Sequence, residues 1–232
     1  MAEEREYIVC TSKDGSVCVG CELNGKLNCK YDDGLVRCFR KRHLPFTVFG
    51  YIVLGTAWLL TGLWWTFLLY ALVQLMNFTF IETLFLCRHC PFYEKEGQTL
   101  TCITLKGLPR QWTFDLSPMS RFDRIGMTIV GGLMDLFPLL VGLYASWFLL
   151  STGADILFTI LMIGLTVIFL IAIGYLEKYI GENYCEKCVN FSCMMNKVPD
   201  ELKEKFLSIN PAMREAWEAS GYKSPKESVT QG

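Results

Sequence analysis

The chain has 232 residues, of which 52% are hydrophobic and 19% charged, and its formal net charge is −1. The apolar residues gather into long blocks instead of spreading as amphipathic stripes, so the composition argues against an ordinary soluble domain and indicates a membrane protein. The chain opens MAEEREYIV and stays polar for about forty residues, so we expect no N-terminal secretory signal.

The first apolar block covers residues 45–86 and carries one charged residue, Glu82. As a single helix rising about 1.5 Å per residue, this block would reach about 63 Å, roughly twice the hydrocarbon core of a bilayer. The block must therefore fold back. Thr61 and Gly62 interrupt it near its middle, and they predict the turn of a transmembrane hairpin.

The second apolar block covers residues 125–176, within a predicted hairpin of residues 124–177, and is interrupted by the polar stretch STGAD at residues 151–155. The same length argument predicts a second hairpin. We therefore expect an all-α integral membrane protein with four transmembrane helices in two hairpins.

The basic residues predict the orientation of these helices. All 22 lysines and arginines lie before residue 45, between residues 87 and 124, or after residue 177, and the two turns carry none. Basic loops stay on the cytoplasmic side. We therefore expect both termini (residues 1–44 and 178–232) and the central loop (residues 87–123) to be cytoplasmic.

The cysteines lie entirely in these predicted cytoplasmic segments. A reducing compartment, an odd number of cysteines and three CxxC pairs favour metal thiolates over a disulfide framework. Redox-switch thiols and ordinary thiols are the alternatives. The candidate metal ligands are Cys10, Cys18, Cys21, Cys29, Cys38, Cys87, Cys90, Cys102, Cys185, Cys188 and Cys193.

Two of the CxxC pairs follow directly on apolar blocks. The pairs Cys87/Cys90 and Cys185/Cys188 would together form a four-thiolate site that clamps one hairpin to the other. A third cysteine follows each pair, so two three-thiolate sites completed by another residue, or one polynuclear cluster, are alternatives. Zinc and iron or iron–sulfur centres both accept thiolate ligands, so the pattern does not choose between these cofactors.

Residues 1–44 are predicted to form a small cysteine-rich β module. Short apolar stretches alternate with KDGS, NGK and DDG, and Asn-Gly and Asp-Gly favour tight hairpin turns. A module of about forty residues buries little core and needs a staple, which a metal ion held by four of its five cysteines would supply. A structural zinc ribbon and an electron-carrying iron site are the two interpretations.

Several absences narrow the function. His43 and His89 are the only histidines and both lie outside the predicted helices, so this chain alone cannot build a bis-histidine haem in the bilayer. No CxxCH, GxxxxGK or GxGxxG occurs, so haem c and nucleotides are not expected. The basic residues 40–43 sit at a membrane boundary, where we expect them to fix topology and touch anionic lipid instead of nucleic acid.

Two acidic residues lie within the apolar blocks. Asp135 is close to the predicted bilayer midplane, three residues before Pro138, and is either a proton or ion site or a bonded side chain at a packing kink. Glu82 lies nearer the cytoplasmic interface and is a weaker candidate for the same role. Residues 200–221 have the pattern of two short amphipathic helices, whose apolar faces could cover the metal clusters, the membrane surface or a partner protein.

These features favour a non-enzymatic membrane scaffold or accessory protein whose cytoplasmic face is organised by cysteine-ligated metal, zinc before iron, and docks a cytoplasmic partner or complex subunit. The first alternative is a membrane electron-transfer subunit with iron–sulfur or rubredoxin-like iron, which would belong to an oxidoreductase complex. The second alternative is a transporter that uses Asp135. The sequence offers no paired nucleophile and base, so a self-contained enzyme is not expected.

Overall fold

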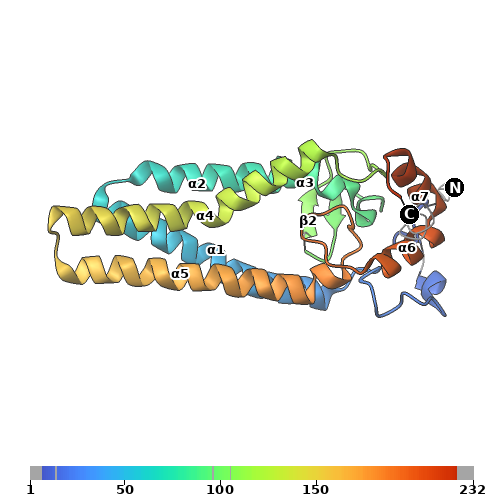
Figure 1. Ribbon diagram of the computed structural model, residues 1–232, viewed down its shortest axis with the longest axis horizontal. Helices are drawn as coiled ribbons and strands as arrows, with labels where there is room; N and C mark the ends of the chain where they lie inside the picture. The colour runs from blue at the N-terminus through green and yellow to red at the C-terminus, as the bar shows by residue number, and fades with distance from the viewer. Residues whose placement is uncertain (1–6, 14, 96, 105, 224–232) are drawn as a thin grey trace, which may run out of the picture.

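The computed structural model describes residues 7–13, 15–95, 97–104 and 106–223. Its main body is a bundle of four helices that are long and apolar enough to cross a membrane, which confirms the predicted number. Figure 1 shows the two short turns at one end of the bundle and the described parts of the N-terminal and C-terminal segments at the other. The four candidate spans are α1 (Asp33–Thr61), the stretch Trp64–His89 that begins with α2 (Trp64–Met76), α4 (Arg121–Thr152), and the stretch Ile156–Lys187 that begins with α5 (Ile156–Asn183).

The turns of the bundle lie where the polar interruptions predicted them. Helix α1 is followed by Gly62 with φ 77° and α4 by Gly153 with φ 67°. A left-handed residue after a helix is favourable for glycine because it has no Cβ. Asp155 then caps α5 by accepting a hydrogen bond from the Leu157 amide at 2.8 Å. That each helix pair crosses a bilayer as a hairpin stays a prediction.

Pro138 lies inside α4 without ending it. Proline has no amide hydrogen, so the carbonyl of Met134, four residues earlier, loses its partner within the helix. The hydroxyl of Tyr70, on α2, donates to this carbonyl at 3.1 Å. A neighbouring helix therefore satisfies the group that the proline releases.

The buried face of the second span is polar. Thr66, Tyr70 and Gln74 are the buried residues of α2, and Tyr51 of α1 donates to the Gln74 side chain at 2.9 Å. A π-helical segment, η2 (Asn77–Ile81), then leads into α3 (Glu82–Phe85). The extra residue of a π-turn shifts the helix register.

A lobe of short elements covers the end of the bundle opposite the turns, and we call residues 7–32, 86–120 and 184–223, where described, the cysteine lobe. Its two strands, β1 and β2, pair antiparallel, with Thr101 opposite Lys106. Its elements are η1 (Gly15–Cys18), η3 (Cys87–His89), η4 (Pro91–Tyr93), β1 (Thr99–Thr101), β2 (Lys106–Pro109), η5 (Cys185–Lys187), α6 (Asp200–Ile209) and α7 (Pro211–Ala219).

The N-terminal segment does not take the predicted β form. Its described residues contain no strand, only η1, loops and one isolated bridge between Asn24 and Leu27. The Asn-Gly turn is present, with Gly25 at φ 77°, but it has no strands to connect. The predicted Asp-Gly turn is instead a helix start, because Asp32 accepts hydrogen bonds from the amides of Gly34 and Leu35 and caps α1.

Helices α6 and α7 of the tail pack on the other segments of the cysteine lobe. Phe206 and Leu207 of α6 are fully buried, and Met213 and Trp217 of α7 are nearly so. They share one apolar core with side chains of the N-terminal segment and of the loop after α5. Most of the apolar surface of the tail is thus covered within this chain, although Ile209 of α6 is 45% exposed.

Candidate metal centres

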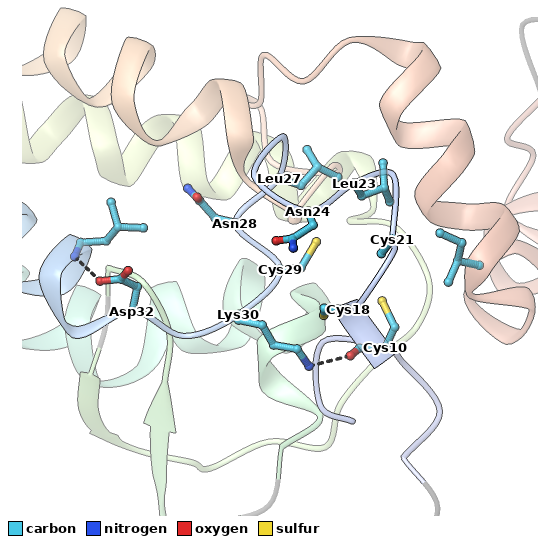
Figure 2. A pocket seen from close by; sticks show the side chains of 12 residues that line it. Cys10, Cys18, Cys21, Leu23, Asn24, Leu27, Asn28, Cys29, Lys30 and Asp32 are labelled. Carbon is cyan, nitrogen blue, oxygen red and sulfur yellow. Dashed lines mark hydrogen bonds between the residues drawn. The ribbon is translucent and has the colours of Figure 1, made fainter. Parts of the chain in front are cut away.

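Four of the five N-terminal cysteines line one pocket. The pocket has a volume of about 160 Å³, and its lining includes Cys10, Cys18, Cys21 and Cys29. Figure 2 shows these residues on neighbouring loops of the N-terminal segment. We call these four cysteines, which line one hollow, the first thiol group. Their number equals the four ligands that a structural zinc site requires.

One backbone hydrogen bond and three from a lysine side chain hold these loops in place. The Cys21 amide donates to the Cys18 carbonyl at 3.2 Å and closes the CxxC turn, and Gly20 inside that turn has φ 78°. The ammonium group of Lys30 donates to the carbonyls of Cys10, Thr11 and Lys13 at 3.0, 3.1 and 2.6 Å. The Lys30 side chain therefore fixes the backbone around Cys10 by hydrogen bonds to three carbonyl groups.

Asn210, between α6 and α7, connects the tail to the thiol group. Its side-chain oxygen accepts from the Cys10 amide at 2.7 Å, and its side-chain nitrogen lies 3.4 Å from the Cys10 sulfur and 2.8 Å from the Phe206 carbonyl. Asn210 is 1% exposed, so water cannot replace these bonds. An N–H group directed at sulfur is a typical outer-shell partner of a metal thiolate.

Burial disfavours the deprotonated form of two of these thiols. Burial, together with the neighbouring cysteines, raises the pKa of Cys29 to about 12, and burial also raises the pKa of Cys10. Metal ligation needs deprotonated sulfur. Within the described residues, no three histidine, cysteine or acidic side chains are arranged as a formed metal-binding group, so a metal ion would have to draw the thiols of the pocket closer.

A second thiol group lies where the helix pairs enter the cysteine lobe, and its members are Cys87, Cys90, Cys102, Cys185, Cys188 and Cys193. Cys90 interacts electrostatically with Cys102 and Cys188, and Cys188 also interacts with Cys193. Cys87 interacts with Cys102 and Cys193. The group thus joins three segments of the chain, with Cys102, beside β1, common to several of its pairs.

Cys185 lies at the edge of this second group. Its cysteine neighbours are Cys188 and Cys193, on its own loop. Of the two predicted pairs, Cys90 and Cys188 interact electrostatically across the helix exits, and each also interacts with Cys102. That the two pairs share one metal ion stays a prediction.

Hydrogen bonds already join the two exits. Asn190 is 5% exposed and donates to the carbonyl of Leu86 at 3.1 Å, directly before the first CxxC pair. Asn196 donates to the carbonyls of Cys188 and Asn190 at 2.7 and 3.1 Å. The loop after α5 is therefore fixed on the end of the second span.

His89 lies between Cys87 and Cys90, but its ring nitrogens are engaged elsewhere. Its Nδ1 lies 2.8 Å from the Ser117 carbonyl oxygen, and its Nε2 accepts from the Arg88 guanidinium at 3.1 Å. Asp123, in the capping box of α4, approaches Nε2 at 3.7 Å. His89 therefore holds the central loop on α4 and is a poor candidate for a metal ligand.

Cys38 is separate from both thiol groups. It lies on α1, and its sulfur is 3.0 Å from the Tyr179 hydroxyl on α5. Arg42 lies over the same tyrosine ring, 4.0 Å from its centre. These contacts join α1 to α5, and the N-terminal pocket is lined without Cys38.

The two acidic residues of the apolar blocks have different surroundings. Glu82 interacts electrostatically with the cysteines Cys87, Cys102 and Cys193, so it borders the second thiol group. Asp135 is half-buried on α4 and interacts electrostatically with Tyr70 and with Glu177 of α5. Because Glu177 is itself a carboxylate, it cannot form an ion pair with Asp135. Glu82 is thus the acid with a position next to possible metal ligands.

Sequence reasoning missed three polar side chains of these centres: Lys30, Asn190 and Asn210. No local pattern points to Asn210, because its partner Cys10 lies 200 residues away in the chain. Comparison with protein-family models, with curated proteins and with solved structures finds no match for this chain.

Proposed function

We propose that this protein is an integral membrane scaffold or accessory protein with both termini in the cytoplasm. Its cysteine lobe is held together by cysteine-ligated zinc and docks a cytoplasmic partner. The observation that carries the proposal is the gathering of Cys10, Cys18, Cys21 and Cys29 around one pocket beneath a tail that bonds to Cys10. Four thiolates are a common ligand set of structural zinc.

The position of the cysteines supports the cytoplasmic assignment. The second thiol group lies where the helices enter the lobe, and the described parts of the N-terminal and C-terminal segments lie at the same end of the bundle (Figure 1). All eleven cysteines are thiols in this structure, which agrees with a reducing compartment.

A metal would stabilise the lobe by joining segments distant in sequence. Zinc in such a site contributes folding free energy and no redox chemistry. The N-terminal ligands would fix the segment on which α6 and α7 rest, through the buried side chains of Phe206, Met213 and Trp217. The second group, with Glu82 at its border, would fix the helix exits. A lobe held in this way offers a rigid surface, and Val19, 85% exposed between Cys18 and Cys21, places an apolar side chain on it.

Chelation of the full-length protein tests the proposal. Removal of zinc should raise hydrogen exchange in residues 200–220 and around residues 10–29, while the four long helices stay protected. Exchange that is unchanged after complete zinc removal would contradict a structural metal. Iron with visible charge-transfer absorption in place of zinc would favour the electron-transfer alternative.

A further inference from the structure

The first turns of α1 carry a row of cations on one face. Arg37, Arg40 and Lys41 are all exposed, and their spacing of three and four residues places them on one side of the helix. The next residues along this face, Leu44 and Val48, are 64% and 49% exposed. The same helix face is therefore basic toward the cysteine lobe and apolar toward the bundle.

Strand β2 supplies a second wall opposite this face. Arg40 donates to the Lys106 carbonyl at 2.8 Å, and the Lys106 ammonium lies 2.9 Å from Asp33. Two adjoining hollows of about 360 and 370 Å³ share Arg40, Leu44 and Lys106 in their linings. We call these two hollows together the α1–β2 groove.

The groove changes in character along its length. Toward the lobe, its lining has four cations and one carboxylate: Arg37, Arg40, Lys41 and Lys106 against Asp33. Toward the bundle, the shared residues are joined by three uncharged polar and three apolar side chains: His43, Thr47, Thr104, Phe39, Phe78 and Leu108.

Most of the positive charge in the groove is uncompensated. Asp33 pairs with Lys106, whose ammonium also lies 4.9 Å from the centre of the Tyr31 ring. Among the described residues, no ion pair joins Arg37, Arg40 or Lys41 to a carboxylate. Arg42, by contrast, turns to the other side of α1, where it contacts Tyr179 of α5.

We propose that the α1–β2 groove binds an anionic phospholipid, with the headgroup phosphate on Arg37, Arg40 and Lys41 and an acyl chain that runs along Leu44 and, beyond the groove on the same helix face, Val48. Arginine forks bind phosphate oxygens in pairs, which suits the two guanidinium groups of the groove. A soluble phosphate compound would satisfy the cations alone. The apolar continuation on the same helix face fits a ligand that carries its own hydrocarbon, and membranes supply such ligands at this boundary.

Native mass spectrometry of the full-length protein in detergent tests this site. Phosphatidylglycerol should bind more tightly than phosphatidylcholine. The double substitution Arg37→Gln with Arg40→Gln should weaken phosphatidylglycerol binding by about fivefold for each cation removed. Lys178→Gln is the matched control, because Lys178 is an exposed cation near the end of α5 that enters the cysteine lobe and lies outside the groove. This variant should change the affinity less than twofold.

A charge-preserving variant and a competitor without acyl chains separate the contribution of charge to lipid binding from that of the hydrocarbon. Arg37→Lys with Arg40→Lys keeps the charge and should retain the preference for phosphatidylglycerol. Glycerol phosphate, which has the anionic group without chains, should not displace the lipid at equal concentration. The proposal is overturned if phosphatidylcholine binds equally well, if Lys178→Gln lowers affinity as much as the double glutamine variant, or if glycerol phosphate competes equally. This site does not depend on the proposed metal.

Discussion

The bond between Asn210 and Cys10 predicts that the far end of the chain controls the N-terminal metal site. Asn210→Ala removes the acceptor 2.7 Å from the Cys10 amide and the N–H group 3.4 Å from its sulfur. Loss of an outer-shell partner typically lowers metal affinity by about 10–100-fold, which corresponds to about 1.4–2.8 kcal/mol. The cost of leaving one buried amide without a partner, about 1–3 kcal/mol, is of the same size.

Zinc affinity of the purified protein, measured by competition with a coloured chelator, checks this prediction. Asn210→Asp keeps an acceptor for the Cys10 amide but has no N–H for the sulfur and adds a negative charge beside the thiolates, so it should also bind zinc more weakly. Ser208→Ala is the control, because it removes a hydrogen bond within α6, from the Ser208 hydroxyl to the Lys205 carbonyl, and Ser208 is not among the residues that line the pocket. A folded Asn210→Ala protein that binds zinc within twofold of the wild type would refute the reasoning.

The other predictions concern the bundle, the second thiol group and the topology. Tyr70→Phe should lower the unfolding free energy in mixed micelles by about 0.6 kcal/mol and at most about 1.7 kcal/mol. The loss should be smaller in a Pro138→Ala background, where the amide of residue 138 can again donate a hydrogen bond to the Met134 carbonyl. Additive costs of the two changes would contradict the capping of that carbonyl by Tyr70. Serine substitutions of Cys90, Cys102 and Cys188 should each release the same metal equivalent and add little in pairs, whereas losses that add would indicate independent sites. In right-side-out vesicles of metal-stripped protein, an impermeant reagent should label Cys102 only after lysis, and labelling before lysis would contradict the cytoplasmic assignment.

The helices of the bundle could be predicted because a bilayer imposes a length that an apolar run either fits or exceeds. Residues 45–86 exceed it, and Gly62 was the available place for the turn, as the structure bears out. The buried polar face of α2 was not predicted. Its signal is the spacing of Thr66, Tyr70 and Gln74, which recur every fourth residue within an apolar run.

The predicted β module was wrong because the same short motif has two structural uses. Asp-Gly favours a hairpin turn, but aspartate is also a strong helix cap, and Asp32 caps a helix here. The gathering of Cys10, Cys18, Cys21 and Cys29 follows from their closeness in sequence. The contact of Asn210 with Cys10 depends on how the tail packs on the lobe, which no local pattern encodes.

Metal analysis of full-length protein purified without added metal tests the central claim most directly. The proposed scaffold predicts at least two tightly bound zinc equivalents per chain, one for the N-terminal pocket and at least one for the thiols at the helix exits. Cys21→Ser should then lower the content by about one equivalent and leave the remainder bound. Metal-free protein in which all eleven cysteines react with a thiol reagent under native conditions would contradict the account.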